Sequence, residues 1–528
     1  MLTTFRRAAA MITVIIAATF TVQARYTDIL KIRRANSGIA ALRSMADGEH
    51  YTVMSKNAII RRSYSDKSLC DTIFISPFAI ADYTLSANEQ MALVPQSATV
   101  QPIYRHSYTA DYLLLERGGT KNCFQSVRDI TFSPDNRTLA YCKDNNLYLY
   151  SIGTNKHTAV TTDGQWNKII NGTSDWVYEE EYGFTQAYAF SPDGAKIAYL
   201  RFDESAVPTF EMMRFDDKLY NKAYSFKYPK AGDCNSKVEL WIYDIATQSK
   251  QKVDVGSNSD QYIFNLYWTA AGELTFYRVN RLQNHFEVVL QRADGTQKVI
   301  YNEQSDRYVE RPSRSTITFI DSERFIVLEE TTTGWMHLYL HSTNKGRVNA
   351  ITSGRWEVTA LNGFDGKNIY YTSTERSELC RDLYSVKLNG KGKKLLTPEG
   401  GFNDIKASAG MKYYIRTFTD VNTPNIITVN NNKGVVIDTL ADRRAAVAAA
   451  GTLARKQFRQ FVTERGDTLN YYIQLPENYD PTKLYPVLLT QYSGPGSQSA
   501  RNRWSVDWED VLTKRGYIVA CCDGRGTG

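Results

Sequence analysis

The feature that most constrains the fold is an internal repeat of a turn, an alternating apolar strand, a polar turn and a second strand rich in Tyr. Its clearest copies are TFSPDNRTLAYCKDNNLYLYSI at 131–152 and AFSPDGAKIAYLRFDE at 189–204. Turns of the Ser-Pro-Asp type begin at Ser86, Ser133 and Ser191, with spacings of 47 and 58 residues. This period is typical of four-stranded propeller blades. The repeat therefore predicts a mainly β chain.

Composition agrees with a packed, β-rich protein. The chain has 528 residues, of which 42% are hydrophobic and 35 are Tyr, many of them in short alternating stretches. Tyr and β-branched residues favour strands. A β-sandwich or several small β domains would also account for alternation. We favour the propeller because the copies share both a period and a turn motif.

The pattern changes after about residue 455. FVTERGDTLNYYIQLPENYD predicts a hairpin, YPVLLTQYSG a buried strand that enters a Gly/Pro loop, WEDVLTKRG a helix ending at Gly516, and YIVACCDGRG another buried strand. Strand, helix and strand with apolar runs indicate the start of an α/β sheet. An α/β hydrolase needs several more units, on the order of 150 residues. We therefore expect an incomplete second domain.

The opening segment predicts a signal peptide at residues 1–24. Arg6 and Arg7 precede an apolar run from Ala8 to Val22, and small residues lead to a cleavage point after Ala24. An uncleaved anchor is the alternative, but about 15 apolar residues are short for a bilayer span. We expect a secreted or periplasmic protein with no membrane span after cleavage.

Charge and cysteine patterns argue against several site classes. The net charge of +7 is spread along the chain, so no nucleic-acid partner is expected. Seven scattered cysteines show no zinc spacing, one or two disulfides stay open, and Cys521 and Cys522 are predicted to be small buried residues. GRGTG at 524–528 follows a strand without a helix after it, which disfavours a dinucleotide site. No metal and no cofactor are predicted.

Six stretches in order along the chain resemble the dipeptidyl peptidase IV branch of the prolyl oligopeptidase family of serine peptidases. They are YRHSYTADY, DWVYEEEYGF, YLRFDESAVPTF, GWMHLYL, QYSGPGSQ and DGRGTG. The resemblance implies an eight-bladed β-propeller at 46–455 and a truncated α/β-hydrolase domain at 456–528. It also implies that residues 25–45 pack on the hydrolase part, and that peptides bind in a cavity between the two domains.

The glutamates of DWVYEEEYGF gain a role from this resemblance. It implies that Glu180 and Glu181 bind the free ammonium of a peptide, which sets the distance to the bond that is cut. Two converging carboxylates suit this task because charge-assisted hydrogen bonds are strong and directional. Glu179 should point elsewhere, since adjacent helical side chains diverge. A solvated acidic turn is the plain alternative, but flanking aromatic residues argue for partial burial.

A tyrosine and an arginine loop complete the implied site. Tyr492 follows the strand that enters the Gly/Pro loop, and the resemblance implies that its hydroxyl donates to the oxyanion of the reaction. Arg311, in a loop ahead of GWMHLYL, loosely matches a substrate-facing arginine of the family. For a second family arginine, Arg117 and Arg128 are nearby in sequence, but neither has the expected spacing.

The catalytic triad itself is not visible in the sequence. No G-x-S-x-G elbow occurs, and all six histidines precede residue 342. We therefore expect that this chain alone does not hydrolyse peptides and that it is a fragment, with a truncated pseudo-enzyme or a partner chain as alternatives.

Two function classes stay open. The first is a secreted dipeptidyl peptidase acting on peptides with a free N-terminus and Pro or Ala at the second position, with a tripeptide-releasing variant. The second is a non-catalytic propeller that binds peptides or proteins. The family resemblance further implies a homodimer for the full-length enzyme.

Overall fold

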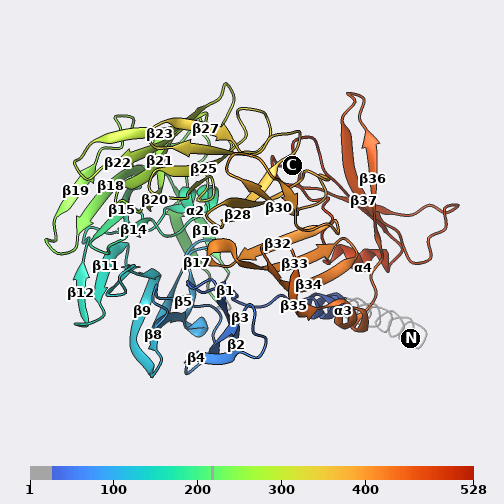
Figure 1. The fold of residues 1–528 in the computed structure, drawn as a ribbon, viewed down its shortest axis with the longest axis horizontal. Helices are drawn as coiled ribbons and strands as arrows, with labels where there is room; N and C mark the ends of the chain where they lie inside the picture. The colour runs from blue at the N-terminus through green and yellow to red at the C-terminus, as the bar shows by residue number, and fades with distance from the viewer. Residues whose placement is uncertain (1–25, 216–218, 528) are drawn as a thin grey trace, which may run out of the picture. The chain divides into compact units, whose positions relative to one another are not determined.

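The computed structural model describes residues 26–215 and 219–527 (Figure 1). The predicted signal peptide lies outside the described residues. The chain divides into two compact units. The first comprises residues 41–354 with 388–390, and the second comprises residues 26–40, 355–387 and 391–527.

The first unit contains six antiparallel blades in chain order, of which blades two and three share one sheet and blade four has five strands. Blade one consists of β1 (Arg43–Ser44), β2 (His50–Ser55), β3 (Ala58–Ser63) and β4 (Cys70–Ile75). Blade two consists of β5 (Thr84–Leu85), β6 (Met91–Pro95), β8 (Tyr108–Glu116) and the first part of β9 (Gly119–Phe132). Blade three consists of the last part of β9 with β10 (Thr138–Lys143), β11 (Asn146–Ser151) and β12 (Lys156–Ala159). The long β9 pairs with β8 through its first part and with β10 through its last part, so it joins two blades. The short η1 (Ser97–Thr99) and β7 (Gln101–Pro102) precede β8.

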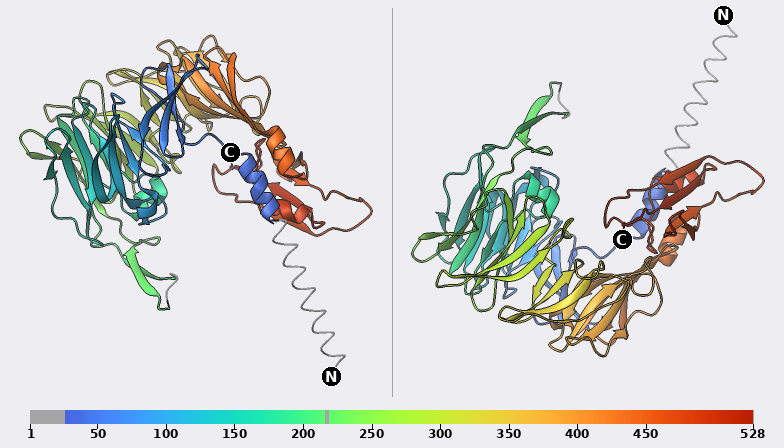
Figure 2. Two further views of the ribbon diagram at one scale, coloured as in Figure 1. Left: turned by 90° about the horizontal axis from the view of Figure 1, so that it is seen from below. Right: turned by 90° about the horizontal axis from the view of Figure 1, so that it is seen from above.

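Blades four to six complete the first unit. Blade four consists of β13 (Ile169–Asn171), β14 (Tyr188–Phe190), β15 (Lys196–Asp203), β18 (Lys237–Asp244) and β19 (Lys250–Val253). Blade five consists of β20 (Gln261–Trp268), β21 (Leu274–Asn280), β22 (His285–Gln291) and β23 (Gln297–Gln304). Blade six consists of β24 (Ile317–Phe319), β25 (Arg324–Glu329), β26 (His337–Ser342) and β27 (Gly346–Ala350). In blade four, β13 and β14 both pair with β15. A two-stranded hairpin of β16 (Thr209–Arg214) and β17 (Lys222–Lys227) projects from this blade in both views of Figure 2.

The repeated Ser turn is built the same way in three blades. Ser133 Oγ donates to Asp135 Oδ1 (2.5 Å) and accepts from the backbone N–H of Thr138 (2.9 Å). Ser86 and Ser191 make the matching pair of bonds in their own turns. All three Ser side chains are buried. The repeat in the sequence is therefore a repeat of side-chain hydrogen bonds that start the next strand.

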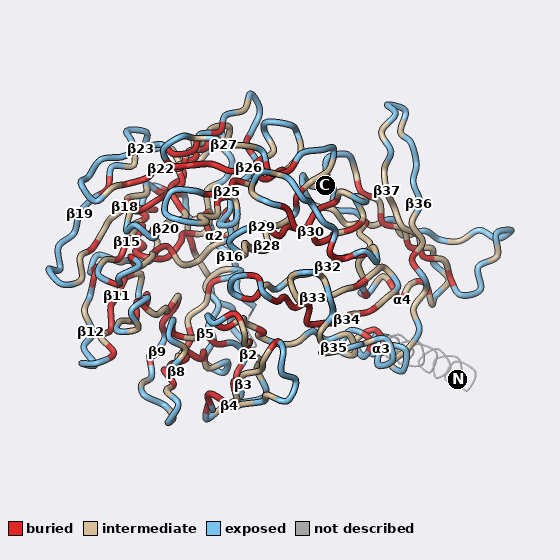
Figure 3. Tube along the Cα trace, viewed as in Figure 1, coloured by how far each residue is buried: buried red, intermediate tan, exposed pale blue. Residues whose placement is uncertain are grey.

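The core of the first unit consists of inward-facing strand residues. The strand β26 is buried at every position, as Figure 3 shows, whereas β16 is exposed at every position. The largest cluster joins blades four to six through side chains such as Phe202, Phe264, Phe276 and Phe325. This cluster also receives the helix that carries the predicted glutamates.

The second unit contains two further blades. They are β28 (Val358–Phe364), β29 (Asn368–Ser373), β30 (Asp382–Lys387), β31 (Lys394–Leu395); and β32 (Phe402–Ala407), β33 (Tyr413–Asp420), β34 (Thr423–Asn431), β35 (Val436–Asp442), with η2 (Ala409–Met411) between β32 and β33. The described residues thus form eight antiparallel blades, six in the first unit and two in the second, which confirms the predicted mainly β propeller class.

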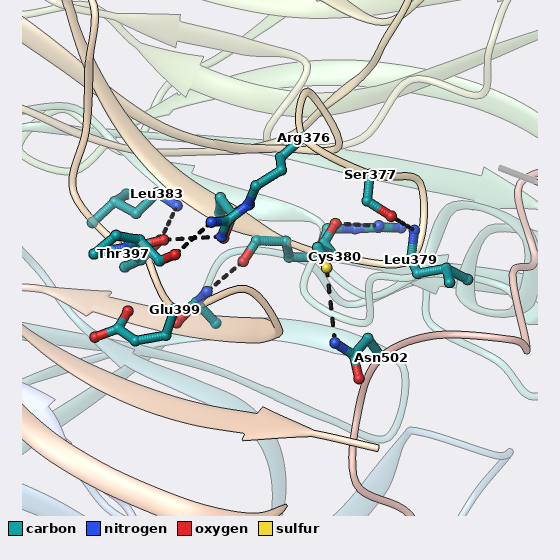
Figure 4. Close-up of polar contacts among 12 residues, drawn as sticks. Arg376, Ser377, Leu379, Cys380, Leu383, Thr397, Glu399 and Asn502 are labelled. Carbon is teal, nitrogen blue, oxygen red and sulfur yellow. Dashed lines mark hydrogen bonds and ion pairs between the residues drawn. The ribbon is translucent and has the colours of Figure 1, made fainter. Parts of the chain in front are cut away.

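Blade seven contains an ion pair whose carboxylate is buried. Asp382 is fully buried, and Arg376 donates to both of its carboxylate oxygens at 2.8 and 2.5 Å. Figure 4 shows Thr397 between two partners: its Oγ1 accepts from the N–H of Leu383 (2.9 Å) and its carbonyl accepts from Arg376 (3.2 Å). The guanidinium therefore ties the outer turn of the blade to β30.

The C-terminal segment forms a mixed sheet in the order β36-β37-β39-β38. Its strands are β36 (Lys456–Val462), β37 (Thr468–Gln474), β38 (Val487–Thr490) and β39 (Ile518–Cys522), with the helices α3 (Arg444–Ala450) before it and α4 (Glu509–Thr513) within it. The hairpin and the helix ending near Gly516 are confirmed, and β38 and β39 are parallel. The prediction of a buried strand at β38 is wrong, because β38 is the edge of this sheet and Val487 and Leu489 are exposed.

The helix of residues 26–35 packs within the second unit. Ile29 and Ile32 are buried against Val447, Val506 and Val511. Across the described ranges, none of the helices combines the length and the apolar character that a bilayer crossing requires.

The seven cysteines all lie in the described part of the chain, and all are free thiols. The disulfides that the sequence left open are therefore not formed. Cys521 is buried and Cys522 half-buried.

Candidate functional site

The three glutamates lie on α2 (Trp176–Tyr182), a helix of seven residues. Asp175 caps its N-terminus by accepting from the N–H of Tyr178 at 2.9 Å, and Gly183 ends it with a left-handed φ of 70°. Isolated helices of this length are not stable in water. Packing supplies the rest, since the rings of Tyr178 and Tyr182 are buried in the core cluster of blades four to six.

Tyr178 also fixes the helix by a polar contact. Its hydroxyl accepts from the backbone N–H of Ile263 in β20 at 3.0 Å. Burial raises the pKa of this hydroxyl well above its ordinary value. The helix is therefore attached to the neighbouring blade both by apolar contact and by a hydrogen bond.

The glutamates divide between two faces of α2. Glu179 is 1% exposed and lies on the buried face with Tyr178 and Tyr182. Glu180 is half-buried and Glu181 is exposed. Because successive helical residues are rotated by about 100°, three adjacent carboxylates need not converge. Only Glu180 and Glu181 are open to a ligand.

Each open glutamate forms an ion pair with one arginine. Arg105 Nη1 lies 2.9 Å from Glu180 Oε1, and Arg311 Nη1 lies 3.2 Å from Glu181 Oε2. The Arg105 side chain is 71% exposed and the Glu181 side chain 56%, so both pairs face solvent. Exposed pairs of this kind contribute little to stability, about 0 to 1 kcal/mol. They leave the second oxygen of each carboxylate without a protein partner among the described residues.

The two open carboxylates keep acceptor capacity although each has an arginine partner. Each is paired through one oxygen, so its second oxygen remains available as an acceptor. Glu179, the third carboxylate of α2, is buried on the other face and adds no open acceptor. The arrangement is suited to receive the N–H donors of one ammonium group.

Of these two arginines, one was a candidate from the sequence and the other was not predicted. Arg311 was only a loose match, and the structure brings it to Glu181. Arg105 was not singled out, although it lies within YRHSYTADY. Arg128 pairs with its neighbour Asp129 at 2.9 Å, and Arg117 is exposed in the turn between β8 and β9. No spacing rule identifies Arg105, because its partner lies 75 residues away.

Two further acids lie buried close to α2. Burial raises the pKa of Asp175, although Ser236 Oγ donates to it at 2.5 Å. Burial, with a smaller contribution from the charge of Asp175, raises the pKa of Glu204 to about 8. Glu204 Oε2 has no hydrogen-bond partner in the described chain. Sequence reasoning gave no signal for Glu204.

A cavity of about 380 Å³ opens in the same unit along the first strands of blades four to six. Its wall includes Gln186, Tyr188, Arg314 and the stacked rings of Tyr267 and Phe319, 5.2 Å apart. Arg314 lies three residues after Arg311, so one loop serves both the cavity and the Glu181 pair. The cavity is large enough for a short peptide segment.

Tyr492 lies in the second unit, in the loop that follows β38. Its side chain is 76% exposed, and the described residues give its hydroxyl no hydrogen-bond partner. The ring lies against Gly494, where an added Cβ would come within 2.6 Å of it. Only glycine fits at that position without displacing the tyrosine.

Asp523 fastens this loop to the sheet. It follows β39, is buried, and accepts from the N–H groups of Ser499 (2.8 Å) and Ala500 (2.7 Å). A carboxylate that accepts two backbone N–H groups makes strong, charge-assisted bonds. The base of the Tyr492 loop is therefore fixed even though the tyrosine itself is exposed.

Comparison with known proteins identifies the family. Residues 87–425 match the family described as the dipeptidyl peptidase IV (DPP IV) N-terminal region. The chain belongs to the dipeptidyl peptidase IV family. This family is one of peptidases, so the hydrolase assignment of the sequence resemblance is confirmed at that level.

Relatives of this family cover nearly the whole chain. Dipeptidyl peptidase 4 from Trichophyton equinum is 30% identical, and that from Trichophyton rubrum 29%; each alignment covers 93% of this chain and 67% of the relative. The crystal structure of Porphyromonas gingivalis dipeptidyl peptidase 4 matches with a TM-score of 0.88 and 37% identity, over 93% of this chain and 72% of that one. The dipeptidyl peptidase IV similarity thus extends through both compact units.

Proposed function

We propose that this chain recognises peptide substrates for a serine-type dipeptidyl peptidase, which releases dipeptides with Pro or Ala at the second position. Glu180 and Glu181 bind the free ammonium of the peptide, and Tyr492 donates its hydroxyl to the oxyanion formed at the cut bond. The observation that carries the proposal is the pair of carboxylates on α2, each of which is bound to an arginine through one oxygen only.

The ammonium binds to the oxygens that the arginines leave open. Arg105 contacts one oxygen of Glu180 and Arg311 one oxygen of Glu181. An ammonium has three N–H donors and no acceptor, so it has enough donors for both remaining oxygens without displacing either guanidinium. An N-acetylated peptide has no positive charge at this end and should be rejected. This requirement makes the enzyme an exopeptidase.

Tyr492 contributes through its exposure. An oxyanion donor must present its O–H to the substrate rather than to the protein, and Tyr492 has no protein acceptor in the described chain. A single donor of this kind contributes about 3 to 4 kcal/mol to transition-state stabilisation. Asp523 and Gly494 support the proposal, since they hold the loop and the ring.

Export to the periplasm or the medium is part of the proposal. The basic and apolar opening segment is removed after Ala24. Sequencing of the mature N-terminus should start at Arg25, and an N-terminus at Met1 would contradict export with cleavage.

Calorimetry on the chain tests the recognition step. A tetrapeptide with Pro at its second position should bind in the free-amine form, and N-acetylation should weaken binding ten- to a hundredfold, or about 1.4 to 3 kcal/mol. Glu181→Gln and Glu180→Gln should each weaken binding of the free-amine peptide by a similar factor. The control Glu211→Gln changes an exposed carboxylate on β16 and should have no effect. Equal binding of both peptide forms would refute the ammonium role.

A further inference from the structure

We infer that Glu179 is a positioning residue of this site: its buried carboxylate fastens the loop of residues 103–107 to α2 and thereby sets Arg105 beside Glu180. The inference rests on the proposed ammonium-binding role of Glu180. It gives the first glutamate of the run a task different from that of the other two.

The contacts of Glu179 are those of a clamp. Its Oε1 accepts from the N–H of His106 at 2.7 Å and from the N–H of Ser107 at 2.9 Å. Glu179 is 1% exposed, and its Oε2 has no hydrogen-bond partner in the described chain. A buried carboxylate is costly unless it is bonded, so these two amides are what hold it in place. In return it holds them.

The loop depends on this contact at its tip. The N–H of Ile103 donates to the carbonyl of Ser107 (2.8 Å), and the N–H of Tyr104 donates to Ser107 Oγ (3.2 Å), which closes the loop on itself. Tyr224 Oη donates to the carbonyl of Ile103 (2.8 Å) at the base. Glu179 adds the bonds at His106 and Ser107, which come directly after Arg105.

The clamp leaves one oxygen of Glu180 open. Because the two amides next to Arg105 are fixed to Glu179, Arg105 is held where its guanidinium contacts a single oxygen of Glu180. The other oxygen of Glu180 is then available to the ligand. A released loop would let Arg105 move between solvent and both oxygens, and the ammonium would lose a fixed partner.

Hydrogen exchange and calorimetry on the full chain test this assignment. Glu179→Asp keeps the charge but withdraws the carboxylate by one methylene, and Glu179→Ala removes it. Both variants should speed amide exchange in the 103–107 segment at least tenfold. Both should also weaken the binding of a free-amine tetrapeptide with Pro at its second position about tenfold. Glu179→Gln keeps an acceptor oxygen and should retain slow exchange and affinity. Slow exchange and full affinity in Glu179→Gln would show that the hydrogen bonds of this side chain, rather than its charge, hold the loop.

A double-variant cycle tests the link to Arg105. Arg105→Gln should weaken binding of the same peptide about as much as Glu179→Asp does. The double variant should bind no more weakly than either single variant, because Glu179 acts through Arg105. Additive losses would overturn the link, as would fast exchange with unchanged affinity. Unchanged exchange in Glu179→Asp would overturn the clamp itself, and this readout holds even if Glu179→Ala fails to fold. If the unmodified chain binds free-amine and acetylated peptides equally, the proposed function fails while the exchange data still decide the clamp.

Discussion

The buried acid Glu204 should make the stability of the first unit depend on pH. Burial raises its pKa from 4.5 to about 8, with the negative charge of Asp175 adding to the effect and Lys227 opposing it. Between these pH values the folded state holds a proton that the unfolded state releases. Stability from this group is therefore fully present below pH 4.5 and is lost as pH rises to 8.

The magnitude follows from the two pKa values. A gap of roughly 3.5 corresponds to about 5 kcal/mol, since each tenfold difference in proton affinity is worth about 1.4 kcal/mol. Glu204→Gln removes the titration while keeping the size of the side chain. The variant should match the unmodified chain near pH 5 and exceed its stability by up to about 5 kcal/mol at pH 9. For a unit of this size that is about 10 °C in the melting temperature, at about 2 °C per kcal/mol.

Calorimetric melting between pH 5 and pH 9 measures this difference directly. The control Glu211→Gln makes the same substitution at an exposed position of β16, so its melting curve should stay parallel to that of the unmodified chain. A constant difference between Glu204→Gln and the unmodified chain at every pH would refute the reasoning. It would mean that Glu204 is ionised in the folded state throughout.

Three further outcomes are expected. Gly183→Ala should lower the stability of the unit that holds α2 by about 1 kcal/mol in chemical denaturation, because φ is 70° there; no loss would show that the turn tolerates a side chain. Arg376→Met leaves the carboxylate of Asp382 buried without its cation, so the melting transition of the unit with blades seven and eight should lose about 3 to 5 kcal/mol, and an unchanged transition would contradict this. Asp523→Ala should speed limited proteolysis in the Tyr492 loop, whereas Asp523→Asn, which keeps an acceptor, should change it less; equal cleavage of both variants and the unmodified chain would count against the clamp.

Much of the local structure could be predicted from the sequence. The turns at Ser86, Ser133 and Ser191 form by hydrogen bonds between a side chain and backbone groups up to five residues away, so a short motif determines them. The hairpin of β36 and β37 follows the same logic of alternation and a tight turn. The strand at β38 was predicted as buried because an apolar run indicates burial, but its place at the sheet edge leaves it exposed.

The candidate site was predictable only in part. Glu180, Glu181 and Tyr492 were predicted as site residues from family motifs, and their roles stay predictions. Arg105 and Glu204 were not, because their partners come from other blades or from the packed interior rather than from a neighbouring residue.

The sequence by itself determined the repeated Ser turns of the blades and the crowding of three carboxylates at 179–181. Short-range hydrogen bonds and strand alternation are encoded within a few residues, which is why they can be read without a fold. Only the tertiary structure decided that Glu179 turns inward while its two neighbours meet arginines 75 and 130 residues away. Contacts of that range depend on how whole blades pack, and no local pattern carries that information.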